Sequence, residues 1–116
     1  MKNYIQGATE IRTFTAPTGG VVAGTALRIG QYVIIPAITA AAGTLFDGAI
    51  SGRFSVPKVS AQAWTVGQLV YWDSATSTFT NVGGTGDTLV GRAGAIAANP
   101  SATGVVDFDG AARANL

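Results

Sequence analysis

The chain has 116 residues, the size of one domain, and contains neither cysteine nor histidine. Disulfides, thiolate metal sites and the commonest general base of enzymes are therefore excluded. Only 11% of the residues are charged, against about 25% in an average soluble domain, and the net charge is +1. A surface with so few charges is poorly protected against association. We therefore expect partners to cover much of the surface of this protein. A neutral surface rich in Ala, Thr and Gly that does not associate is the alternative.

Nucleic acid and membrane are not expected as partners. The seven basic residues are scattered and interspersed with six acidic ones, whereas nucleic-acid binders usually carry a clustered basic face. The longest apolar run, residues 32–42, contains Pro36 and is too short to span a bilayer. The first residues have no apolar stretch typical of a signal peptide. We expect the protein to be made and kept in the cytoplasm, or to be carried in a particle assembled there.

The first half of the chain predicts short strands separated by turns, because its glycines interrupt runs rich in Val, Ile, Thr and aromatic residues. Strands are expected at residues 10–16, 26–30, 31–35 and 34–38, with a turn at Pro17–Gly20. The clearest strand is Leu45–Val56, which alternates strictly between two faces. Gly48 and Gly52 lie on its apolar face and indicate strong coiling or close approach of another layer.

The second half continues in the same way. A connector over residues 59–66 contains Trp64, and residues 68–73 and 77–82 are expected to form a hairpin. Further strands are expected at residues 88–98 and 103–108. We therefore predict an all-β fold, a small barrel-like or sandwich domain of short antiparallel strands. It consists of an extended N-terminal arm, residues 1–11, and a single β domain, residues 12–116.

No set of residues predicts catalysis, a metal site or a cofactor. The glycine-rich loop at residues 83–86 is followed by Asp87, where a phosphate-binding loop needs lysine. Asp107 and Asp109 share a strand face and would suit calcium or acid–base chemistry, but the solvent-facing side of a strand is the preferred interpretation. Serine has no histidine partner, and Lys58 is expected to snorkel at a strand end. We predict no enzyme activity and no small-molecule substrate.

The aromatic residues of the second half have two interpretations. Trp64, Tyr71, Trp72 and Phe79 lie close together in the sequence, and both sides of the strand from Leu69 to Asp73 are apolar. One side is expected to face the core of the domain and the other a neighbouring subunit. Core and interface aromatics look alike in one sequence, so both interpretations stay open. The predicted oligomer or capsid interface consists of Trp64, Leu69, Tyr71 and Trp72.

Ordered pieces along nearly the whole chain resemble the phage capsid cement, or head decoration, protein family. This family was once catalogued as a domain of unknown function and is sometimes mislabelled as recombinase-like. The most specific piece is Gly67-Gln68-Leu69-Val70-Tyr71-Trp72-Asp73. The other matching pieces are Met1–Gln6, Ala16–Val21 with Gly24 and Gly30, Thr39–Gly43, Gly52–Lys58 and Leu89–Ala93.

The resemblance implies a structural virion protein on the capsid exterior, a homotrimer that bridges neighbouring major capsid proteins. With it we predict that the N-terminal arm adds to a neighbour's sheet edge or lies on the capsid. The predicted arm contacts are Lys2, Asn3, Tyr4, Ile5 and Gln6. Two other functions were weighed: a virion-surface module that binds host glycan or the cell surface through Trp64, Tyr71 and Trp72, and a hydrolase that uses Asp107 and Asp109.

Overall fold

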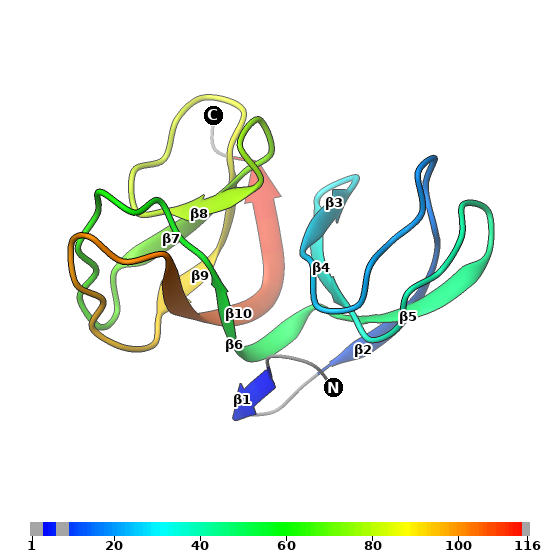
Figure 1. Ribbon diagram of the computed structural model, residues 1–116, viewed down its shortest axis with the longest axis horizontal. Helices are drawn as coiled ribbons and strands as arrows, with labels where there is room; N and C mark the ends of the chain where they lie inside the picture. Colours follow the sequence, from blue (N-terminus) through cyan, green and yellow to red (C-terminus); the bar gives the residue numbers. More distant parts are fainter. Residues whose placement is uncertain (1–3, 7–9, 115–116) are drawn as a thin grey trace.

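The computed structural model describes residues 4–6 and 10–114, with the side chains of residues 10–110 (Figure 1). This part of the chain contains no helix, and so no helix long and apolar enough to cross a membrane. All strand pairings within its two sheets are antiparallel. The six-stranded sheet has the order β1 (Tyr4–Gln6), β6 (Ser51–Pro57), β10 (Thr103–Ala114), β9 (Thr88–Ala93), β7 (Leu69–Asp73) and β8 (Thr78–Thr80). The four-stranded sheet has the order β2 (Ile11–Thr15), β5 (Leu45–Ala49), β4 (Tyr32–Pro36) and β3 (Leu27–Ile29).

The all-β prediction is confirmed, and of its two forms the structure favours the sandwich. The six-stranded sheet curls until the residue after β6, Lys58, forms a single parallel bridge with Phe79 of β8. The amide of Val59 adds a 3.0 Å hydrogen bond to the carbonyl oxygen of Phe79. The sheets are not closed into a barrel. Ile11, which was placed in the predicted arm, is the first residue of β2.

The predicted strand Leu45–Val56 is two strands that belong to different sheets. The chain leaves β5 at Ala49, passes through Ile50 and enters β6 at Ser51, and Figure 1 shows it crossing from the small sheet to the large one. The alternation of buried and more exposed residues resumes after this bend, with Phe54 and Val56 buried. The period was therefore predicted correctly, while the change of sheet was not.

Gly48 shows the close approach that its position predicted. A Cβ atom at Gly48 would lie 2.2 Å from Cγ2 of the buried Ile34. Ile34 belongs to β4, which pairs with β5 through Pro36 and Gly48. The approaching group therefore comes from the neighbouring strand of the same sheet and not from another layer.

Two hydrophobic cores hold the sheets. In the larger core, Phe108 makes edge-to-face contacts with Phe54 and Phe79 at ring distances of 5.9 and 5.6 Å. Ile35 of β4 belongs to this larger core, whereas its neighbour Ile34 belongs to the smaller one. Both faces of β4 are therefore covered, which explains its uninterrupted apolar run. The smaller core consists of Ala16, Val21, Ile34, Phe46 and Ile50.

Candidate partner-contact surfaces

The predicted arm begins as a strand at the edge of the large sheet. The strand β1 pairs with β6 of the same chain, Tyr4 opposite Phe54 and Gln6 opposite Arg53, with an irregular register. Lys2 and Asn3 lie outside the described residues, and only the backbone of Tyr4–Gln6 is described. The strand β1 is the outermost strand of its sheet, and no strand of the described residues pairs with its second edge. Capsid contact by residues 2–6 stays a prediction.

The two tryptophans of the predicted interface lie in the core of the chain. Trp64 is 1% exposed and Trp72 4% exposed. The ring of Trp64 packs on Gly104, where a Cβ atom would lie 2.5 Å from Cζ3 of the indole. Trp72 packs against Phe79 at a ring distance of 4.9 Å. These side chains hold the fold together and do not offer surface to a partner.

The other two residues of the predicted interface lie on the outer side of β7. Val70 and Trp72 point into the core, so Leu69 and Tyr71 point the other way. Leu69 is exposed and Tyr71 is half-buried. A contact through Leu69 and Tyr71 therefore stays a prediction that is compatible with their positions.

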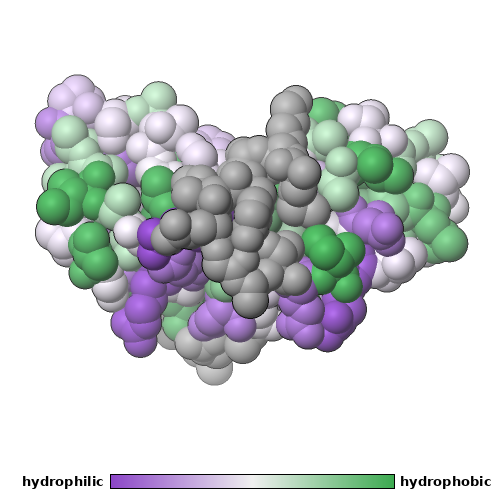
Figure 2. All heavy atoms as spheres, turned by 90° about the horizontal axis from the view of Figure 1, so that it is seen from below, coloured by the Kyte–Doolittle hydropathy of each residue, from purple (hydrophilic) through white to green (hydrophobic). Residues whose placement is uncertain are grey.

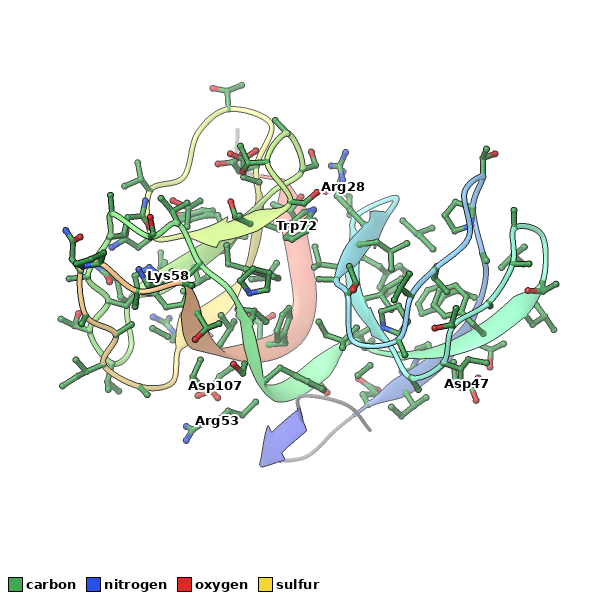
Figure 3. All side chains as sticks on the ribbon, viewed as in Figure 1. Arg28, Asp47, Arg53, Lys58, Trp72 and Asp107 are labelled. Carbon is green, nitrogen blue, oxygen red and sulfur yellow. The ribbon has the colours of Figure 1, made fainter. Side chains whose placement is uncertain are left out.

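An ion pair marks the outer face of the large sheet beside β1. Arg53 of β6 and Asp107 of β10 lie opposite each other. Nε of Arg53 donates to Oδ1 of Asp107 at 2.6 Å, and Nη2 donates to Oδ2 at 3.0 Å. This hydrogen bonding raises the pKa of Arg53, and desolvation acts in the opposite direction. Figure 3 shows both side chains on the underside of the sheet.

This ion pair also removes the basis for an acid–base pair of aspartates. The carboxylate of Asp107 is engaged by Arg53, while Val106 and Phe108 on the opposite side are buried. Asp109 is exposed on the same outward face. Among the residues that the structure describes, no group of three or more His, Cys, Asp or Glu side chains is placed to hold a metal ion. The two aspartates form the solvent-facing side of a strand, as preferred from the sequence.

Lys58 departs from its prediction, because its side chain is buried and does not extend to water. Its Nζ donates to the backbone carbonyl oxygen of Val59 at 2.8 Å and to that of Gln62. The ammonium also lies 5.9 Å from the centroid of the Trp64 ring. The buried charge is thus satisfied by carbonyl dipoles and by an aromatic face. Lys58 therefore fixes the loop that follows β6.

An exposed apolar surface, here called the loop patch, lies at one end of the large sheet. A bridge between Trp64 and Ala97 places the loop before β7 beside the loop after β9. The amide of Gly67 continues this contact with a 2.9 Å hydrogen bond to the carbonyl oxygen of Ala93. Ile96, with 79% of its surface exposed, is the most open large apolar residue of the described chain. The loop patch consists of Ala63, Val66, Leu69 and Ile96, all exposed.

A second exposed apolar surface, the small-sheet patch, lies at the far end of the four-stranded sheet. Here the amide of Ala16 donates to the carbonyl oxygen of Thr44, and the amide of Gly43 donates to that of Ala16, both at 2.8 Å. Leu45, the first residue of β5, is 68% exposed. The small-sheet patch consists of Pro17, Ala41, Ala42 and Leu45, all exposed.

The two patches lie at opposite ends of the molecule. Figure 1 places the loops before β7 and after β9 on the left and the loop before β5 on the right. In the view from below, hydrophobic residues gather toward both ends and hydrophilic ones between them (Figure 2). Of the residues in these two patches, sequence reasoning identified only Leu69, although a signal for the others was present. Residues 13–27, 29–46, 59–72 and 93–106 contain no charged residue, and every residue of both patches lies in one of these four segments.

Comparison with protein families gives a match over almost the entire chain. A model of the phage cement protein family covers residues 5–108. The matched span begins in β1 and ends in β10, so it includes both sheets and both patches. Comparisons with curated proteins and with solved structures find no significant match. The chain belongs to the phage cement protein family.

Proposed function

We propose that this chain, whose family gives it a structural role in association with a phage capsid, binds the capsid exterior and stabilises the shell by bridging neighbouring major capsid proteins. The observation that carries the proposal is the family match over residues 5–108. It is supported by a sparsely charged chain with exposed apolar surface at both ends. Exposed apolar surface marks interaction sites in monomeric soluble proteins where it forms large contiguous patches.

The proposed assembly is a homotrimer, and we propose that its affinity for the capsid comes from multivalent binding. Three modest contacts on one trimer raise avidity by a factor on the order of 10²–10⁴ without any single strong site. This fits a chain whose largest aromatic side chains, Trp64 and Trp72, are used inside the fold. The role we propose needs no catalytic step and no small-molecule substrate.

The capsid contact is proposed at the N-terminal arm. The strand β1 is the outermost strand of the large sheet, so its free backbone edge suits the addition of a partner strand. The ion pair of Arg53 and Asp107 lies on the adjoining outer face and gives that side a polar surface.

Deletion of residues 2–8 tests this contact. The truncated chain is expected to keep its thermal unfolding transition and to bind purified capsids more weakly in a sedimentation assay. A variant with residues 2–6 replaced by a Gly/Ser segment of equal length separates the arm's sequence from its length. Normal capsid binding by the truncated chain would show that the arm is not the contact. Cryo-microscopy of capsids with and without the protein tests the function itself, which requires added density on the exterior.

Binding of host glycan or of a cell surface is not favoured as the function. The aromatic platform for it would have been Trp64, Tyr71 and Trp72. Two of these three rings are buried in the larger core, which leaves only the half-buried Tyr71. One partly covered ring is a poor stacking platform.

A further inference from the structure

We propose that copies of the chain meet end to end, the loop patch of one against the small-sheet patch of the next, with Arg92 of the first copy paired to Asp47 of the second. The inference rests on the proposed homotrimer and names the surface that builds it. It is carried by two charged residues that have no ion-pair partner among the described side chains, each beside one of the two apolar patches.

Arg92 adjoins the loop patch. It is exposed on β9, directly opposite Leu69 of β7. Its Nη1 donates to the backbone carbonyl oxygen of Gly67 at 3.2 Å, which directs the guanidinium toward the loop before β7. Asp107 lies opposite Arg92 on the other side, but both of its carboxylate oxygens are engaged by Arg53. Among the described residues, Arg92 therefore has no acidic partner.

Asp47 adjoins the small-sheet patch. It is exposed on β5, two residues from Leu45, so both side chains lie on the same face of the strand. Figure 3 shows Asp47 directed away from the sheet on the underside of the molecule. The hydroxyl of Thr13 donates to its Oδ1 at 2.7 Å. No basic side chain of the described chain forms an ion pair with this carboxylate.

The two surfaces are complementary. Each joins exposed apolar residues, among them a leucine, to one charge, and the two charges have opposite signs. The apolar residues of both patches come from charge-free segments, so these residues bring no further charged side chain into the contact. An ion pair at the border of an apolar contact fixes its register and disfavours wrong partners. A second copy of this chain therefore offers each patch the surface that it lacks.

The contact must lie between copies, because within one chain the patches are at opposite ends of a molecule whose longest extent is 38 Å. A contact between two different surfaces is heterologous, and such a contact generates a closed ring when the rotation between copies closes. A threefold ring requires a contact of this kind. Where the rotation does not close, the same contact generates an open filament, so the molar mass of the assembly distinguishes a trimer from a growing chain of copies.

A charge exchange tests the pairing. We expect the variants Arg92→Glu and Asp47→Lys each to weaken self-association by about tenfold or more, measured as molar mass by light scattering over a concentration series. The double variant with both substitutions restores opposite charges across the contact and is expected to associate nearly as well as the original chain. Arg28→Glu is the matched control, because Arg28 is exposed on β3 and belongs to neither patch.

Polar substitutions test the apolar part. Ile96→Ser and Leu45→Ser are expected to weaken self-association, and Val82→Ser, at a residue with 67% exposure outside both patches, is expected to leave it unchanged. Thermal unfolding of each variant at a concentration where all are monomeric shows that the fold is kept. A monomeric original chain at every concentration would overturn the inference. A double charge variant as weak as the single variants, or a control variant as disruptive as they are, would overturn it too.

Capsid binding is measured separately, so that one result contradicts the proposed contact between copies and a different result contradicts the proposed function. A chain that self-associates by these rules and yet binds no capsid contradicts the capsid role and leaves the contact standing. A chain that binds capsids as a monomer, with the patch variants losing capsid binding, contradicts the contact. In that case the capsid protein itself covers the patches.

Discussion

Substitution of Gly104 by alanine tests how tightly the larger core is packed around Trp64. An added Cβ atom would lie 2.5 Å from Cζ3 and 2.8 Å from Cε3 of the indole, and 3.2 Å from Cδ of Lys58. Neither obstacle can move aside into solvent, because Trp64 is 1% exposed and Lys58 is buried. Gly104 is also held in the sheet opposite Val56 of β6. An extra methyl group in such a site costs about 1–3 kcal/mol, and we expect the upper half of that range.

Urea unfolding followed by tryptophan fluorescence measures the effect. Gly84→Ala is the control, because a Cβ atom there meets nothing closer than 3.5 Å and the backbone has no positive φ. The combination of Gly104→Ala with Trp64→Phe is the sharper test, since the smaller ring leaves room for the methyl group. The double variant should then be more stable than the sum of the two single losses predicts. If Gly104→Ala is as stable as Gly84→Ala, the packing argument is wrong.

Other substitutions follow from the same contacts. Gly91→Ala places a Cβ atom 1.9 Å from the backbone oxygen of Asp107, so it should disrupt the pairing of β9 with β10 and yield little folded protein in a solubility assay. Thr88→Val replaces a buried hydroxyl that has no hydrogen-bond partner among the described residues, and it should stabilise the chain by about 1 kcal/mol in urea unfolding; a loss of stability would refute this. Arg53→Gln should lower the unfolding midpoint slightly, and high salt should shrink the difference. Because the pKa of Arg53 is raised, its contribution is present at neutral pH and is lost only in strongly alkaline solution, so the difference should be constant from pH 6 to about 9. Lys58→Met leaves carbonyl groups of the following loop without their donor and should destabilise the fold, whereas Lys2→Met should not.

The strand content was predictable from the sequence because it rests on local periodicity. The alternation between Leu45 and Val56 reports which side of the chain is buried, and burial in the structure follows it closely. Periodicity carries no information on which sheet buries each half, so the bend at Ile50 was missed. The bend depends on a distant contact, in which the amide of Ile50 donates to the carbonyl oxygen of Glu10.

The candidate site was harder to predict, because the same side chain serves a core or an interface. Trp64 and Trp72 are in the core, while Leu69 of the same short region is exposed. Whether such a side chain is buried or exposed depends on which residues pack against it in the fold, and a single sequence does not identify those residues. Lys58 was misjudged for a related reason, since lysine is almost never buried unless its ammonium finds partners. Here those partners are backbone carbonyl groups, which leave no mark in the residue types.

The structure shows where the few charged side chains lie and what they contact. Most of the few charged side chains of the described chain are already engaged. Arg53 and Asp107 form one ion pair, Glu10 and Arg12 form another, and Lys58 is buried. Asp73 and Asp87 accept hydrogen bonds from backbone amides in turns.

Few exposed charged side chains outside these ion pairs and turns are left to select a partner, among them Arg28, Asp47 and Arg92, and their positions therefore matter more than their number. Arg92 stands beside the loop patch and Asp47 beside the small-sheet patch, and the residues of both patches are apolar. A single ion pair bordered by apolar contact is weakly screened by salt in comparison with a fully exposed pair. If these two residues join copies of the chain, self-association should depend on salt far less than a contact made of many surface charges would. A steep loss of association between 50 mM and 500 mM salt would show that the apolar patches contribute little to the contact.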